Sequence, residues 1–119
     1  MNLPSRAESQ TLLEKYIENP ALRHHCEMVA VAMGAYADKL DQDNELWYQT
    51  GLLHDLDWEK FPEEHPLKAV NELLTAYPEE MKRAVLAHGP EITGVEPESK
   101  MERYLFACDE LSGFMHAYA

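Results

Sequence analysis

Apolar residues recur every three or four positions along most of this chain, which is the spacing of one face of a helix. The helices predicted from this pattern cover residues 5–18, 20–40, 43–54 and 99–119, and two more begin at Pro66 and Pro78. No segment alternates polar and β-branched residues as a strand would. We therefore predict an all-α fold: a single compact bundle of about six helices over residues 1–119, with the N-terminal helix of residues 1–18 packed on it.

Side chains that cap helices mark several of these boundaries. Asn19 and Pro20 end the first helix and open the second, because Asn accepts hydrogen bonds from the first turn and Pro fits the first helical position. Ser99 and Glu102 have the spacing of a capping box at the start of the last helix. Residues 89–98, which precede this helix, are predicted to be a loop.

Two histidines fall at the ends of predicted helices. His65 precedes Pro66 and is the predicted N-cap residue of that helix, because the residue before a proline avoids the helical conformation. His88 lies in the last turn of the helix that Gly89 closes. Both positions also leave the imidazole free to face a site between helices.

Polar residues also lie where apolar side chains are expected. They are His25 on the apolar face of the second helix, His54 and Asp55 at the apolar end of the third, and Asp109 in the last. A buried carboxylate without a partner is costly, and no Lys or Arg lies within one turn of Asp109 on its face. A single buried imidazole could simply bond to a carbonyl, but one divalent cation would satisfy all four groups. Such ligands suit Fe, Mn, Co, Ni or Zn, and the lack of cysteine ligands argues against a structural zinc site.

The charge of the chain limits its partners. The 119 residues carry a net charge of −12, which argues against binding a nucleic-acid polymer or an anionic membrane. With only 10 Lys and Arg, an anionic substrate would need a bound cation. Cys26 and Cys108 are expected to be buried thiols in a reducing cytoplasm. No signal-type or membrane-spanning segment is evident, so we expect a soluble cytoplasmic protein.

Five short stretches together resemble the HD superfamily of metal-dependent phosphohydrolases, and more closely its small HDIG-type hydrolases. The stretches are RHHCEMVAVAM, GLLHDLDWE, EEHPLKAVNELL, AVLAHGPE and YLFACDELSGFMHA, in this order from about residue 19 to 117. In the first stretch, the Val-Ala pair four and five residues on assigns the family histidine to His25 rather than His24. A His-Asp dipeptide alone would carry no weight, but the complete ordered set indicates an HD-domain bundle.

The resemblance implies a set of metal ligands. The basic set would be His25, His54, Asp55 and Asp109, and the two further ligands of binuclear members would be His65 and His88, with Asp55 bridging two ions. Asp55 and His54 would be the catalytic pair, and Lys68 could touch a substrate phosphate. Some one-metal relatives carry an acidic residue where this chain has Trp58, so the proton donor stays open. Asp57 and Glu59 flank that position and are otherwise read as solvated loop carboxylates. Trp58 and Phe61 could line the pocket, but we expect them in the core.

The implied activity is hydrolysis of a nucleotide or another small phosphoester by a metal-activated water, with one or two divalent transition-metal ions as cofactor. Two alternatives are an HD-fold di-iron oxygenase, which would use the same ligands, and a non-catalytic nucleotide-binding module. The expected partner is a small phosphorylated molecule, and a homodimer stays open.

Overall fold

The computed structural model describes the backbone of residues 3–118 and the side chains of residues 3–111. The helices are α1 (Arg6–Tyr16), α2 (Pro20–Lys39), α3 (Asn44–Leu53), α4 (Glu79–Ala87), α5 (Pro90–Thr93) and α6 (Lys100–Tyr118), with a short 3₁₀ segment, η1 (Pro62–Glu64), and a short π-helical segment, η2 (Ala69–Leu73). This part of the chain contains no strand, so the all-α prediction is confirmed. The short helix α5 lies in the segment that the sequence predicts to be a loop.

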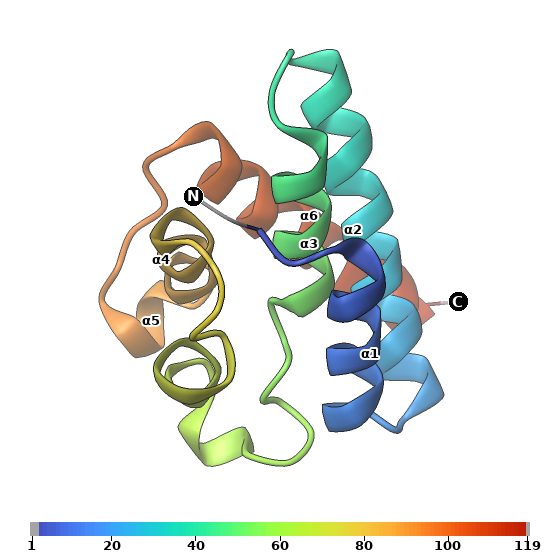
Figure 1. Ribbon diagram of the computed structural model, residues 1–119, viewed down its shortest axis with the longest axis vertical. Coiled ribbons are helices and arrows are strands. Elements are labelled where there is room, and N and C mark those ends of the chain that lie inside the picture. Colours follow the sequence, from blue (N-terminus) through green and yellow to red (C-terminus); the bar gives the residue numbers. More distant parts are fainter. Residues whose placement is uncertain (1–2, 119) are drawn as a thin grey trace.

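The long helices surround a common centre. In Figure 1, α1, α2 and α3 run side by side, α6 crosses α2 and α3, and α4 with α5 lies on the far side of α3 from α2. The chain from α3 to α4 passes through η1 and η2 along one end of the bundle. The ends of several helices therefore converge near the end of α3. Among the described helices, none offers a stretch of the length and apolarity that crossing a bilayer would take.

Two predicted caps are present at the helix starts. The side chain of Asn19 accepts hydrogen bonds from the backbone N–H groups of Ala21 and Leu22, at 2.8 and 3.1 Å. The Ser99 hydroxyl accepts from the Glu102 N–H, and the Glu102 carboxylate accepts from the Ser99 N–H. These caps satisfy N–H groups that lack partners inside their own helix, and they fix where α2 and α6 begin.

The buried face of α2 is rotated from the one that its large apolar residues predict. Tyr36 follows Val29 and Met33 at the three- and four-residue spacing of one apolar face, which predicts that it points inward, but it is 41 % exposed. Val29 and Met33 are buried, and so are the small residues Ala30, Gly34 and Ala37 beside them. The small residues face α3, where an added Cβ on Gly51 would lie only 2.9 Å from the Ala30 Cα. Close contact between two backbones, together with the burial of Val29 and Met33, orients α2.

The loop after α3 corrects another prediction. Trp58, expected in the core, is 48 % exposed. Its backbone N–H donates to the Asp55 carbonyl at 2.9 Å, within a series of tight turns that sends Leu56 and Asp57 inward and Trp58 outward. The ring of Phe61 is half-buried beneath the Lys68 ammonium rather than enclosed.

A buried polar contact fixes α1 to the bundle. The Ser9 hydroxyl donates to the Gln49 Oε1 on α3 at 2.7 Å and accepts from the Tyr77 hydroxyl at 2.8 Å. The Gln49 Nε2 donates in turn to the Pro4 carbonyl. Leu13 and Ile17 pack fully buried beside these groups. Apolar packing and satisfied hydrogen bonds therefore act together at this interface.

The two cysteines are free and buried, as the sequence predicts. Burial raises the pKa of the Cys26 thiol to about 12. This thiol is therefore protonated at neutral pH, and it packs within the buried apolar core.

Replacement of Gly51 by Ala tests the close approach of α2 and α3. The new methyl group would press on the Val29 carbonyl and the Ala30 backbone, so we expect the free energy of unfolding to fall by about 1–3 kcal/mol. Urea unfolding monitored by circular dichroism measures the change. Gly89→Ala is the matched control, because its Cβ would meet only the end of the Ile92 side chain, at 3.9 Å. An unchanged unfolding midpoint in Gly51→Ala would contradict the packing described.

Candidate metal centre

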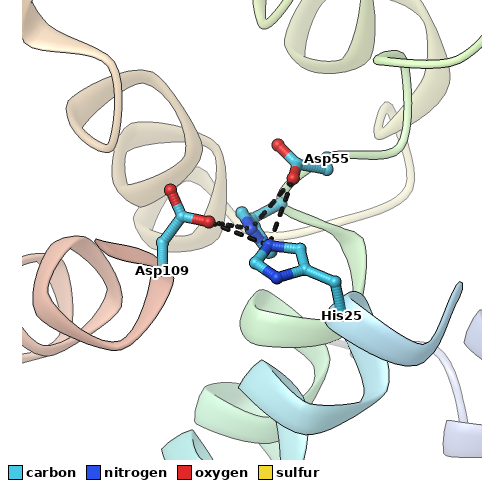
Figure 2. A group of neighbouring side chains, drawn as sticks. His25, Asp55 and Asp109 are labelled. Atoms are coloured by element: carbon cyan, nitrogen blue, oxygen red, sulfur yellow. Dashed lines mark hydrogen bonds and ion pairs between the residues drawn. The ribbon is translucent and has the colours of Figure 1, made fainter. Parts of the chain in front are cut away.

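Four side chains from three helices meet at one point beside the end of α3. His25 comes from α2, His54 and Asp55 from the end of α3, and Asp109 from α6, and their donor atoms lie within 4.8 Å of one another. The Asp109 Oδ1 lies 3.0 Å from the His25 Nε2 and 2.9 Å from the His54 Nε2. The Asp55 Oδ2 lies 3.5 and 3.3 Å from the same nitrogens. Figure 2 shows His25, Asp55 and Asp109 converging from separate segments of the chain.

A second group shares Asp55 with the first. The Asp55 Oδ1 lies 3.5 Å from the His65 Nε2 and 3.4 Å from the His88 Nε2. His88 follows the last residue of α4, and His65 follows η1. The two carboxylate oxygens of Asp55 therefore face two different sets of imidazoles. All six residues that the HD resemblance implies come together, and Asp55 lies between the two sets.

The cluster is largely closed to water. The side chain of His54 is fully buried, and those of His65 and His88 are 8 % and 5 % exposed. Asp109 is the most accessible of the six, at 26 %. Any solvent or ligand that reaches the cluster would meet Asp109 before His54.

Hydrogen bonds fix which nitrogen of three histidines faces the cluster. The Nδ1 of His54 donates to the Gly51 carbonyl at 2.6 Å, and the Nδ1 of His88 donates to the Val85 carbonyl. The Nδ1 of His65 lies 2.5 Å from the Asp57 Oδ1. Because these acceptors have no proton to give, each Nδ1 is the donor and each neutral ring presents an Nε2 lone pair to the cluster.

This donor set fits a metal cation. Imidazole lone pairs and carboxylate oxygens face one another across about 3 Å, which is repulsive unless a positive charge lies between them. Bonds of about 2.1 Å to one ion would place neighbouring donor atoms about 3.0–3.4 Å apart. The distances of 2.9–3.5 Å around Asp55 and Asp109 match that spacing. Without a metal, protons on the imidazoles must supply the positive charge.

The pKa values of the cluster are shifted by the same contacts. Hydrogen bonds to Asp109 and Asp55 raise the pKa of His25 to about 9. Burial disfavours both the His54 imidazolium and the Asp55 carboxylate, but their mutual attraction and the neighbouring hydrogen bonds prevail. The pKa of His54 is raised well above its ordinary value, and that of Asp55 is held well below. The bonds from His25 and His54 likewise lower the pKa of Asp109 against the cost of its burial.

One of the two loop carboxylates is not the solvated group that the sequence suggests. Asp57 is fully buried beside His65. Glu59 accepts the backbone N–H groups of Glu18 and Asn19 at 3.0 and 2.8 Å, and these bonds lower the pKa of its carboxyl. Both carboxylates are engaged, so neither is placed as the proton donor. Sequence reasoning missed the burial of Asp57, because nothing local to this position marks it as inward-facing.

Lys68 has partners away from the cluster. Its ammonium donates to Glu72 at 2.9 Å and lies over the Phe61 ring. The expectation that it touches a bound phosphate therefore receives no support from its position. His24 is exposed on α2, which agrees with assigning the family position to His25. The side chain of His116, the last of the six histidines, lies outside the described residues.

The competition between protons and metal gives a pH test. A raised His25 pKa stabilises the metal-free fold below about pH 6.5, and this contribution is lost as the pH rises through about 9. The lowered Asp109 pKa acts in the other direction and matters only in acid. The metal-free protein should therefore lose on the order of 2–3 kcal/mol of unfolding free energy between pH 6.5 and 9. The stabilisation added by a divalent metal should instead grow over this range, because fewer protons must be displaced.

Thermal unfolding with chelator and with saturating metal, at several pH values, measures both trends. Asp109→Asn is the control, because it removes the first cause of the raised His25 pKa and should flatten the metal-free curve. A metal-free Tm that rises with pH across this window would contradict the account.

Comparison with known families supports this reading of the cluster. A family model described as the HD domain matches residues 22–113, which include all six residues of the two groups. The proteins of this family are largely metal-dependent hydrolases. No curated protein and no solved structure matches the chain significantly. From the match over most of its length, together with the ordered cluster, the chain belongs to the HD domain family.

Proposed function

We propose that the protein is a metal-dependent phosphohydrolase that acts on a nucleotide or another small phosphoester. The observation that carries this proposal is the position of Asp55, with one oxygen toward each of two imidazole groups. A carboxylate in this position can hold two cations side by side. When bound, such ions would activate a water for attack and neutralise charge on the phosphate.

The roles that we assign to the cluster residues follow from how exposed each side chain is. His54 is fully buried and its Nδ1 is engaged, so it holds its place without touching substrate. Asp55 has a pKa held well below its ordinary range, so it stays ionised and serves as a ligand rather than an acid. Asp109 reaches the solvent side, and one of its oxygens points away from the imidazoles in Figure 2. Because its pKa is lowered too, Asp109 is ionised and has no proton to donate, and its outward oxygen can accept a hydrogen bond from an approaching water.

The positions of the Lys and Arg side chains favour a substrate with few negative charges. All ten Lys and Arg lie among the described residues, and seven have partners outside the cluster: Arg6, Lys15, Arg23, Lys60, Lys68, Lys82 and Arg83. The other three, Lys39, Lys100 and Arg103, are exposed. A phosphate would therefore be held by the bound ions rather than by cationic side chains. This favours a single phosphate group over a polyphosphate chain, whose further charges would find no cation.

An exposed aromatic residue lies next to the second group. The Trp58 ring is 48 % exposed and contacts the His65 ring edge-on, with centroids 5.2 Å apart. A flat organic group on an ester bound at the cluster could stack on this indole. Stacking of a base on an aromatic side chain is worth about 1–3 kcal/mol. In the proposed function, Trp58 favours phosphoesters that carry an aromatic group, such as nucleoside monophosphates.

The central experiment combines metal analysis with a phosphatase screen. Protein purified without added metal is analysed for its elements, loaded with the metal found, and assayed for phosphate release from small monoesters. We expect turnover that depends on metal and falls at least about a hundredfold in Asp109→Asn. Glu110→Gln is the matched control, since this exposed carboxylate is the next residue of α6 and lies outside both ligand groups.

Two results would overturn the proposed function. Oxygen uptake by the iron-loaded protein without phosphate release would indicate oxygenase chemistry. Tight binding of nucleotides without turnover at any metal loading would indicate a binding module.

Replacement of Trp58 by Ala tests the substrate class. The KM for a nucleoside monophosphate should rise about tenfold with kcat changed less than twofold, because the stacking is lost while the ligands remain. The KM for an aliphatic monoester such as glycerol phosphate should not change. Leu67→Ala serves as control, as it removes another exposed apolar side chain near His65 in sequence. Equal effects on both substrates would show that Trp58 does not select an aromatic group.

A further inference from the structure

Asp57 is a buried carboxylate that belongs to neither ligand group. It is two residues beyond Asp55, and its side chain is fully buried. One oxygen lies 2.5 Å from the His65 Nδ1, and the other accepts the backbone N–H of Ala69 at 2.9 Å. A carboxylate withdrawn from water at this depth is costly unless hydrogen bonds or a charged partner offset the burial, and these two contacts do so.

The comparison with the other histidines indicates what Asp57 does for His65. His54 and His88 follow helices, and each Nδ1 donates to the carbonyl three residues earlier in the same turn. His65 has an extended backbone, with φ −68° and ψ 135°, after a 3₁₀ segment of three residues. No carbonyl of its own turn holds its ring. Asp57 provides the acceptor that the backbone provides at the other two positions.

This acceptor sets the tautomer of the ring. Because an ionised carboxylate can only accept, His65 carries its proton on Nδ1 and presents the Nε2 lone pair toward the Asp55 Oδ1, 3.5 Å away. The second Asp57 oxygen ties the arrangement to the first residue of η2 through the Ala69 N–H. The ring and the chain on both sides of it are held by one side chain.

We propose that Asp57 is a positioning residue that creates the second metal site by fixing the orientation and tautomer of His65. The inference rests on the two-ion centre of the proposed function and not on phosphoester hydrolysis. It predicts that the first group, formed by His25, His54, Asp55 and Asp109, still binds its ion when Asp57 is altered. Only the group formed by Asp55, His65 and His88 should fail.

Asp57→Asn is the sharpest variant, because it keeps the size of the side chain and removes one acceptor. The single amide oxygen cannot accept from both His65 and Ala69. If it accepts from Ala69, the amide NH₂ faces the His65 Nδ1 and favours the tautomer with the proton on Nε2. That proton would point at Asp55 and block the ring as a ligand.

The experiment is equilibrium dialysis against Mn²⁺ or Zn²⁺ with elemental analysis of the bound metal. We expect two ions per wild-type chain and one per Asp57→Asn chain, with the affinity of the remaining ion within about threefold of wild type. His65→Ala should have the same stoichiometry, and the double variant should lose nothing more. Two ions bound with wild-type affinities in Asp57→Asn, or loss of both ions, would overturn the inference.

Glu102→Gln is the matched control, because Glu102 is another buried carboxylate with side-chain and backbone partners. It belongs to neither ligand group. It should bind two ions whatever its loss of thermal stability. If Glu102→Gln also binds one ion, general destabilisation explains the result and the inference fails.

A second measurement needs no variant and so does not depend on Asp57→Asn folding. Nitrogen-15 NMR of the zinc-loaded wild-type protein should show His65 protonated on Nδ1 and metal-bound through Nε2. The opposite tautomer, or a wild-type protein that binds only one ion, would overturn the inference. Failure of phosphatase activity with two ions bound would overturn only the proposed function.

Discussion

Electrostatic repulsion among acceptors is the constraint on which the centre of this protein depends. The Nε2 atoms of His25 and His54 and the oxygens of Asp55 and Asp109 all point toward one small volume. Such an arrangement is unfavourable unless a cation or protons lie among the groups. The helices that carry these residues pack closely enough to hold the groups there, since Gly51 brings the backbone of α3 against Ala30 of α2. Tight helix packing therefore holds these nitrogen and oxygen atoms rigidly in place. The positive charge that they require comes from the cation or the protons that they bind.

Helix ends are well suited to holding metal-binding histidines. A carbonyl in the last turn of a helix has no N–H partner ahead of it, and it can accept from an imidazole three residues on. His54 uses the Gly51 carbonyl and His88 the Val85 carbonyl in this way. Each bond satisfies a backbone group and turns the Nε2 lone pair to the cluster. His65 is the exception, as its extended backbone makes a distant carboxylate take over the same role.

The sequence predicted the all-α class, the caps at Asn19 and Ser99, and the residues that the structure gathers into one cluster. These features follow from local spacing and from ordered motifs. The role of Asp57 could not be read, because its burial arises where the loop after α3 meets η2, a contact set by tertiary folding. The outward turn of Trp58 and the rotation of α2 escaped prediction for a similar reason. The periodicity argument identifies the buried face of a helix from its large apolar side chains. The close contact of α2 and α3 depends instead on residues with small side chains or none.

The net negative charge of the molecule and the ligand cluster act together on the binding of an anion. A chain with a net charge of −12 repels an anionic substrate at long range, and its Lys and Arg have partners or exposed positions outside the cluster. Divalent ions would reverse the sign of the field locally, at the point where the phosphate of the proposed substrate would lie. The same ions would replace protons that the raised His25 pKa otherwise holds in the cluster. Binding of metal therefore removes the protons from the ligands, strengthens the fold and prepares the site for an anion in a single step, so the three properties should change together.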